Sequence, residues 1–222
     1  MKVLLTGATG TIGGAILRYC LEHPAITSVV AITRRPLESE SPKCSNIIIH
    51  DFKNWNKSIM DRVADADAMI WALGNHTADR EVNYNYAVTF QEAMRRAMPS
   101  ERSARFRFIL ISGALVEPDQ EKSLYFLEAA RKTKGLTETW CLDFSEANKS
   151  VWQTWIVKPG GVYAPGSFNS YLACLLPPPL GSIGEHQLGA FTADLVVEGT
   201  ENEGRVSNGR MVARGDEILK TL

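Results

Sequence analysis

The chain has 222 residues, of which 45% are hydrophobic and 22% are charged, so it carries enough apolar side chains to bury a core and is not a disordered chain. Lys and Arg number 24 against 25 Asp and Glu, and this near-neutral charge argues against a nucleic-acid partner. No apolar run reaches the ~20 residues that cross a bilayer, and Gly7 comes too early for a signal peptide. The four cysteines are scattered, with no metal or redox spacing. We therefore expect a cytoplasmic protein with reduced thiols and no membrane partner.

Apolar runs alternate with helical patterns along the chain. In chain order, strands are expected over residues 2–6, 28–33, 46–49, 68–73, 106–111 and 154–157, with a last short strand over 210–212. Helices are expected to follow the first strand as far as residue 23 and to cover 83–98, 121–148 and 185–197.

The expected strands are continuous apolar runs, which is typical of parallel sheets buried on both faces. Strands that alternate with helices then predict an α/β fold, a single doubly wound parallel sheet of the Rossmann type over residues 1–222. A small C-terminal substrate-binding extension is expected, in which the Gly- and Pro-rich stretch 160–184 forms a substrate lid or pocket wall.

A glycine-rich turn follows the first expected strand. Gly7, Gly10 and Gly13 have the spacing G-x-x-G-x-x-G and stand directly before an amphipathic helix. Glycine is needed in such a turn because the chain bends sharply, its backbone approaches a diphosphate, and the helix packs close to the sheet. The helix N-terminus presents N–H groups and a positive dipole end to the phosphates. The turn therefore predicts dinucleotide binding.

The end of the second expected strand bears on which dinucleotide binds. NAD sites usually place Asp or Glu there to accept hydrogen bonds from the ribose 2′-hydroxyl. This chain instead has Arg34 and Arg35, and a guanidinium can pair with the 2′-phosphate of NADP. We expect NADP(H), with Arg34 ahead of Arg35; the alternative is that both are solvated loop charges.

With these residues the chain resembles the short-chain dehydrogenase/reductase superfamily, and more narrowly its compact atypical members of the TIP30-like and NmrA-like type. The segment 6–13, Thr-Gly-Ala-Thr-Gly-Thr-Ile-Gly, matches the family's turn closely, and the resemblance covers the whole length. It implies that Asp51 reaches the adenine amino group, that Asn85 is the family's helical asparagine, and that the backbone of 159–161 meets the nicotinamide. The expected cofactor residues are Gly7, Thr9, Gly10, Thr11, Ile12, Gly13, Arg34, Arg35, Asp51, Phe52, Ala72, Leu73, Gly74, Lys134, Pro159, Gly160, Gly161 and Val162.

The resemblance fails at the proton donor. Family members carry Tyr-x-x-x-Lys on the helix after the fifth strand, where lysine holds the nicotinamide ribose and lowers the pKa of the tyrosine. Here Lys134, in Lys-Gly-x-x-Glu, is preceded four residues earlier by Ala130. Tyr125 is the obvious substitute, although a regular helix would place it on about the opposite face from Lys134. The resemblance thus implies Ser112, Lys134 and Tyr125 as catalytic residues, and other possible donors are Tyr84, Tyr86, Tyr163, His76 and Asp119.

Three functions remain open on this sequence. The first is an NADP(H)-dependent oxidoreductase acting on a carbonyl or alcohol of a small organic molecule. The second is an enzyme of the same fold without net redox change, such as an isomerase, lyase or cyclase, which Ala130 favours. The third is an NADP(H)-sensing regulatory module. The chain is expected to hold no metal, and its assembly as a monomer or a homodimer is left open.

Overall fold

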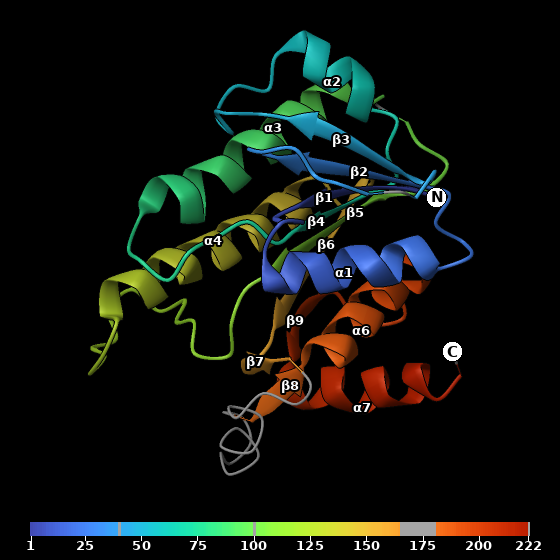
Figure 1. Ribbon diagram of the computed structural model, residues 1–222. Coiled ribbons are helices and arrows are strands. Elements are labelled where there is room, and N and C mark those ends of the chain that lie inside the picture. Colours follow the sequence, from blue (N-terminus) through green and yellow to red (C-terminus); the bar gives the residue numbers. More distant parts are fainter. Residues whose placement is uncertain (40, 100, 165–180, 222) are drawn as a thin grey trace.

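A seven-stranded parallel sheet runs through the computed structural model, which describes residues 1–39, 41–99, 101–164 and 181–221 (Figure 1). Its strand order is β3-β2-β1-β4-β5-β6-β9, so the chain starts in the middle and winds outward in both directions. The strands are β1 (Lys2–Thr6), β2 (Ser28–Thr33), β3 (Cys44–Ile48), β4 (Ala68–Trp71), β5 (Phe106–Ile111), β6 (Trp152–Lys158) and β9 (Gly204–Ser207). The predicted doubly wound fold is confirmed.

Helices cover both faces of this sheet. On one face lie α1 (Thr11–Glu22) and α6 (Glu185–Glu198), with α7 (Asn208–Leu219) packed outside α6 (Figure 1). The other face carries α2 (Lys57–Val63), α3 (Tyr86–Ala97), which continues the π-helical turn η1 (Glu81–Asn85), and α4 (Glu128–Ala147). Beyond the carboxyl end of β6, β7 (Gly161–Tyr163) and β8 (Ser182–Gly184) pair in a small parallel sheet. In the described part of the chain no helix is long and apolar enough to span a bilayer.

Alternate residues of each central strand enter two separate cores. In β1, Leu4 packs into the core under α2, α3 and α4, whereas Val3 and Leu5 pack into the core under α1 and α6. All three are fully buried, which explains why the strands read as unbroken apolar runs. The continuous apolar runs therefore correctly predicted a parallel sheet that is covered by helices on both faces.

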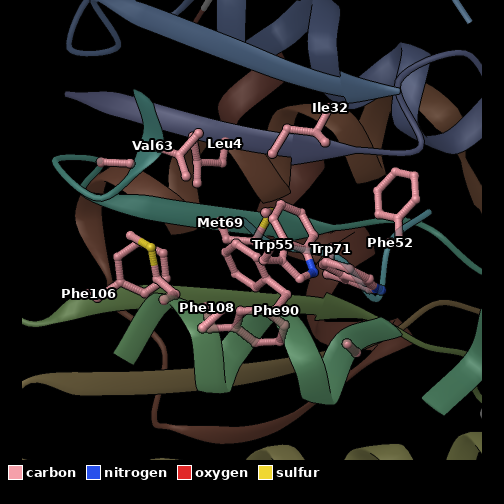
Figure 2. Packing of buried hydrophobic residues seen from close by; sticks show 14 of the residues in the cluster. Leu4, Ile32, Phe52, Trp55, Val63, Met69, Trp71, Phe90, Phe106 and Phe108 are labelled. Atoms are coloured by element: carbon pink, nitrogen blue, oxygen red, sulfur yellow. The ribbon is translucent and has the colours of Figure 1, made fainter. Parts of the chain in front are cut away.

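Aromatic rings fill the core beneath α3. Phe90 is fully buried, and its ring centroid lies 4.9 Å from that of Trp55, 5.6 Å from that of Trp71 and 6.2 Å from that of Phe108 (Figure 2). Phe52, which follows β3, contacts Trp55 and Trp71 edge-on. This cluster joins β4 and β5 to α3 and supports the segment after β3.

Two boundaries differ from those expected. The helix predicted over 121–148 begins only at Glu128, because Leu127 adopts a left-handed backbone (φ +48°) that cannot continue a helix. The backbone N–H of Leu124 donates to the Glu128 carboxylate instead, at 2.8 Å. Residues before Glu128 are thus irregular, and the seven-residue helix α2, which begins with Asn56 as its cap, was not predicted at all.

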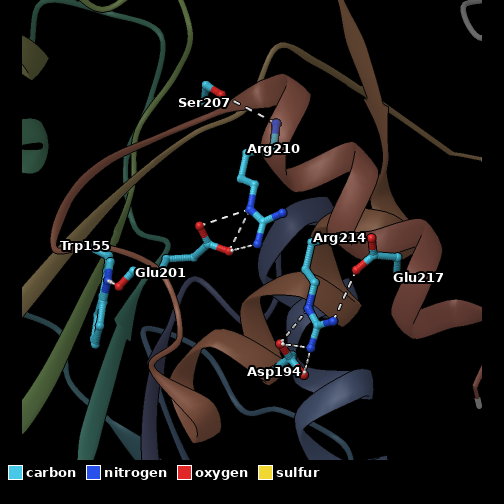
Figure 3. Close-up of polar contacts among 7 residues, drawn as sticks. All are labelled: Trp155, Asp194, Glu201, Ser207, Arg210, Arg214 and Glu217. Carbon is cyan, nitrogen blue, oxygen red and sulfur yellow. Dashed lines mark hydrogen bonds and ion pairs between the residues drawn. The ribbon is translucent and has the colours of Figure 1, made fainter.

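The strand expected over 210–212 is wrong, because these residues lie in α7 and the last strand is β9. Ser207 caps α7 by accepting a hydrogen bond from the N–H of Arg210, as Figure 3 shows. Arg210 pairs with Glu201 at 2.8 Å, and Arg214 pairs with Asp194 of α6 at 3.3 Å. Met211 is fully buried, so the apolar pair at 211–212 marks the inner face of a helix and not a strand. Of the predicted lid over 160–184, residues 165–180 lie outside the described residues.

We predict that Phe90→Ala lowers the free energy of unfolding by about 3–5 kcal/mol, because it removes a buried ring and leaves a cavity among Trp55, Trp71 and Phe108. Urea unfolding followed by tryptophan fluorescence measures it. The matched control is Phe126→Ala, whose ring is 52% exposed and whose loss should cost below about 1 kcal/mol. Equal costs for the two variants would contradict this account of the core.

Candidate active site

The glycine turn brings backbone against backbone. Gly7 has a positive φ of +72°, and a Cβ there would lie 2.4 Å from the carbonyl oxygen of Ala72. A Cβ on Gly13 would lie 2.1 Å from the carbonyl oxygen of Gly7, so no side chain fits at either position. The N–H of Gly10 donates to Gly7 O at 2.9 Å, and α1 then starts at Thr11 without a side-chain cap. The result is a glycine cradle that ends in an uncapped helix N-terminus, the arrangement that suits a diphosphate.

A small cavity of about 50 Å³ lies on one side of this turn. Thr33 positions the loop at its edge, since its hydroxyl donates to Arg35 O at 2.6 Å and accepts from Asn46 Nδ2 at 2.8 Å. Arg34 and Arg35 line the cavity with exposed side chains, and no carboxylate is among the described lining residues. The residues that line it are Gly7, Thr9, Ile32, Thr33, Arg34, Arg35, Phe52 and Leu73. The site therefore places two cations beside a small cavity that also has apolar side chains, Ile32, Phe52 and Leu73, a combination that suits an adenosine 2′-phosphate.

A large cavity of about 780 Å³ lies on the other side of the turn. Its walls are mostly apolar, and the described lining residues include three with titratable or charged side chains, His76, Arg131 and Lys134. They comprise Thr11, Ile12, His76, Ser112, Gly113, Ala114, Leu115, Val116, Phe126, Leu127, Ala130, Arg131, Lys134, Pro159, Gly160, Gly161 and Val162. Thr9 lines the small cavity and Thr11 the large one, so the two cavities flank the glycine cradle.

A buried carboxylate stands behind the large cavity. Glu138 of α4 is fully buried and accepts a hydrogen bond from Ser112 Oγ at 2.6 Å. The same oxygen, Oε1, contacts Lys158 Nζ at 2.5 Å, and Oε2 contacts Arg205 Nε at 2.9 Å. These four residues, Glu138, Ser112, Lys158 and Arg205, form what we call the Glu138 hub. It joins α4 to the ends of β5 and β6 and to β9, and it fixes the direction of the Ser112 hydroxyl proton.

Lys134 lies one helical turn before Glu138 but belongs to a different environment. Its side chain is half-buried in the cavity wall, and burial lowers the pKa of its ammonium group. Among the described residues it makes no ion pair, since Glu138 is turned toward Lys158 and Arg205. Gly135, between them, lets α4 touch the loop after β5: a Cβ there would lie 1.8 Å from Glu117 O.

Two asparagines, Asn83 and Asn85, lie on the π-helical turn η1. Asn83 is buried; its Oδ1 accepts from Asn75 N at 3.0 Å and its Nδ2 donates to Thr77 O at 2.9 Å. Its own carbonyl accepts from Thr137 Oγ1 of α4 at 2.6 Å. Asn85 instead bonds Glu81 within η1. The side chain of Asn83 therefore ties η1 to the loop after β4, and its backbone carbonyl ties η1 to α4.

Several predicted site residues lie apart from the cavities. Tyr125 is fully exposed and lines neither cavity, because α4 begins after it. Asp51 is exposed and accepts from Lys53 N at 2.9 Å in a local turn. Ala130 does line the large cavity, with a methyl group where a tyrosine was expected. Of the alternative donors, His76 lines the large cavity, whereas Tyr84, Tyr86, Tyr163 and Asp119 line neither.

Sequence reasoning missed the Glu138 hub. Glu138 was considered only as a neighbour of Lys134, and Arg205 was not considered. Its partners are 26, 20 and 67 residues away along the chain, so no local spacing joins them. The signal that could have found the hub is the order of the strands. Ser112 follows β5, Lys158 ends β6 and Arg205 lies in β9, and these three strands are neighbours in the parallel sheet.

This geometry defines a dinucleotide-binding protein with an oxidoreductase-type fold. The chain belongs to the NAD(P)H-binding family, whose model matches residues 7–164. Among curated proteins it is similar to Protein FMP52, mitochondrial, from Candida albicans, with 25% identity over 134 residues that make up 52% of this chain and 58% of that protein. The chain thus spans little more than half the length of the curated relatives it matches.

Solved structures share the fold. A short-chain dehydrogenase from Burkholderia cenocepacia in complex with NADP has a TM-score of 0.68 and 20% identity, covering 100% of this chain and 92% of that one. The FolM alternative dihydrofolate reductase 1 from Brucella canis, complexed with NADP, has a TM-score of 0.68 and 17% identity, covering 95% and 93%. At 20% and 17% identity, the similarity to these two structures shows a shared fold.

We predict that Glu138→Ala lowers the free energy of unfolding by about 3 kcal/mol, because it leaves Lys158 and Arg205 without their buried counter-charge. Urea unfolding measures the change. The control is Glu146→Ala, which removes an exposed partner of Lys149 and should change stability by less than about 0.5 kcal/mol. A Glu138→Ala protein as stable as this control would show that the hub contributes little to the fold.

Proposed function

We propose that the protein is an NADP(H)-dependent oxidoreductase that interconverts the carbonyl and alcohol groups of a small, largely apolar organic molecule. The observation that carries the proposal is the placement of two unlike cavities on either side of one glycine cradle. The small one has arginines and no acid, whereas the large one has apolar walls with Ser112 and Lys134.

The residues present fit a nicotinamide dinucleotide. The cradle at Gly7 and Gly13 has no room for side chains, and α1 begins beside it, so its N-terminal dipole favours a diphosphate there. Arg34 and Arg35 would meet the 2′-phosphate, and the segment 159–162 would border the nicotinamide end. The cofactor, when bound, supplies or accepts a hydride. The protein holds the substrate carbon near it in a cavity whose apolar walls limit access of water.

Ala130 supports a second candidate. With a methyl group in the cavity wall and the Ser112 proton directed to Glu138, the usual donor pair is missing, which suits an isomerase, lyase or cyclase of the same fold. Net consumption of NADPH with a carbonyl compound separates the two enzymes. An NADP(H)-sensing module would bind the cofactor and leave carbonyl compounds unchanged; the large apolar cavity favours an enzyme.

The proposed partner is a small molecule, and the protein acts as a monomer or a homodimer. A cytoplasmic location stays a prediction, and the mitochondrial name of the FMP52 relative supplies its alternative. Fractionation of cells that express the tagged protein decides between them.

We predict that Arg34→Ala weakens NADPH binding about 10- to 100-fold, because a charge-assisted bond to the 2′-phosphate is worth ~1.5–3 kcal/mol. NADH lacks this phosphate, so its affinity should change less than about twofold. Isothermal titration calorimetry with both cofactors measures the two affinities, and Arg35→Ala is the neighbouring comparison, with a smaller expected loss for NADPH. Equal losses for NADPH and NADH would defeat the phosphate assignment.

We predict that Tyr125→Phe leaves turnover within about twofold of the wild-type rate, because its hydroxyl is in solvent and away from both cavities. Steady-state oxidation of NADPH at 340 nm with 9,10-phenanthrenequinone as the carbonyl probe measures turnover. A loss of a hundredfold or more in Tyr125→Phe would show that this residue moves into the cavity during catalysis.

A further inference from the structure

We infer that Lys134 is the residue that gives a proton to the substrate oxygen in this protein, in the place of the missing tyrosine. The inference rests on the proposed oxidoreductase function and names a catalytic group for it. Three observations support it: the position of Lys134 beside Ala130, the lack of a carboxylate partner among the described residues, and the hydrogen bonds that occupy Ser112 and Arg131.

Ala130 and Lys134 lie four residues apart on α4, so they share one face of the helix, and both line the large cavity. The methyl group of Ala130 leaves that side of the cavity open to the Lys134 ammonium. On the opposite side, Nζ lies near the loop after β4, 4.0 Å from where a Cβ on Gly74 would stand.

The charges around Lys134 leave its ammonium group available. On α4, Glu138 is held by Lys158 and Arg205, and Arg131 contributes a second positive charge to the cavity wall. The loop after β4 carries His76, Asp79 and Arg80, all exposed, and of these three His76 lines the cavity. Because no carboxylate pairs with Lys134 in the described structure, burial lowers its pKa without compensation.

Two other polar groups of the described cavity wall, Ser112 and Arg131, are engaged. Ser112 gives its only hydroxyl proton to Glu138, so its oxygen faces the cavity as an acceptor. Arg131 donates to Leu115 O at 2.6 Å, and a guanidinium does not release its proton near neutral pH. His76 is therefore the rival donor that an experiment has to separate from Lys134.

The proposed step balances as follows in the direction of carbonyl reduction. As the carbonyl carbon takes up the hydride that the cofactor supplies, the π electron pair of the C=O bond moves to oxygen. That oxygen forms a bond to a proton of the Lys134 ammonium, whose N–H bond breaks and leaves a neutral amine. Solvent returns a proton to the amine. A lysine with a lowered pKa suits this exchange better than an ordinary surface lysine.

The first test titrates Lys134 directly and needs no substrate. In NADP⁺-saturated protein labelled with ¹³C-lysine, the Lys134 Cε resonance is assigned as the one that Lys134→Arg lacks. We expect its pKa to lie below the ordinary value of 10.5, because burial in the cavity wall disfavours the charged ammonium group. A Lys134 resonance that titrates at or above 10.5 overturns the inference, whether or not a probe is reduced.

The second test follows the rate with NADPH and two carbonyl probes, 9,10-phenanthrenequinone and 4-nitrobenzaldehyde. In the wild type kcat should fall as the pH rises through the pKa of Lys134, because the donor must be protonated. Lys134→Arg keeps the charge, but a guanidinium does not release a proton near neutral pH, so kcat should drop about 100-fold and the fall at high pH should disappear. Its affinity for NADPH, measured by calorimetry, should stay within about tenfold, and Lys132→Arg is the matched control with wild-type rates.

Chemical rescue of Lys134→Ala by added amines tests the role of Lys134 as a proton donor, because a residue with only a structural role would not be replaced by a free amine. Ethylamine added to Lys134→Ala should restore part of kcat, and a series of primary amines should restore it in proportion to their acid strength. If Lys134 only holds the cofactor, Lys134→Arg keeps kcat and loses affinity for NADPH, which overturns the inference. If His76→Gln removes the activity and Lys134→Arg does not, His76 is the donor.

Different experimental results would contradict the proposed function and the inference about Lys134. Wild-type protein that binds no NADPH, or that binds NADPH and reduces neither probe, contradicts the proposed function and with it this inference. Wild-type protein that reduces a probe, with Lys134→Arg equally active across the pH range, contradicts the inference alone.

Discussion

Backbone touches backbone where the first strand turns into the first helix, and the arrangement of both cavities depends on that contact. Gly7 lies against the end of β4, and Gly13 lies against Gly7, with no space for a Cβ at either contact. This approach places the N-terminus of α1 at the carboxyl ends of the central strands, where ligands of such sheets bind. It also divides the binding region into two cavities of different character, one with cations and one with apolar walls.

A second constraint lies deeper, at the Glu138 hub. A carboxylate without exposure is stable only when its charge is neutralised and its oxygens are hydrogen-bonded. Lys158, Arg205 and Ser112 meet both needs from three neighbouring positions along the sheet edge. The hub therefore fixes α4 against β6 and β9, and it turns Ser112 into an acceptor toward the cavity. The chemistry available above the sheet follows from this packing as much as from the lining residues themselves.

Much of the fold could be predicted because its signals are local. Six of the strands were expected close to their observed places, since buried parallel strands read as continuous apolar runs. The glycine turn was equally readable from its spacing. The last strand could not be predicted in this way, because a short apolar pair at 211–212 is compatible with a strand and with the buried face of a helix. In the structure Ser207 caps a helix, α7, that contains both residues.

The site was less predictable, since its decisive contacts join distant segments. The exposure of Tyr125 follows from one left-handed residue, Leu127, which no propensity indicates. Asn83, which the family pattern did not indicate, bonds the loop after β4 from the π-helical turn η1. Glu138 has partners on β6, β9 and the loop after β5, and only the strand order brings them together.

The close packing at Gly135 has a consequence for how such a cavity can diversify. Because α4 packs directly on the loop at Glu117, the helix and the loop form one wall of the cavity. A side chain at residue 135 would force the helix and this loop apart. Leu115 and Phe126, by contrast, are partly exposed at the mouth of the cavity and can be exchanged without displacing the wall behind them. Substitutions at the mouth of the cavity can therefore change which ligands bind, while Lys134 and the residues around it keep their positions.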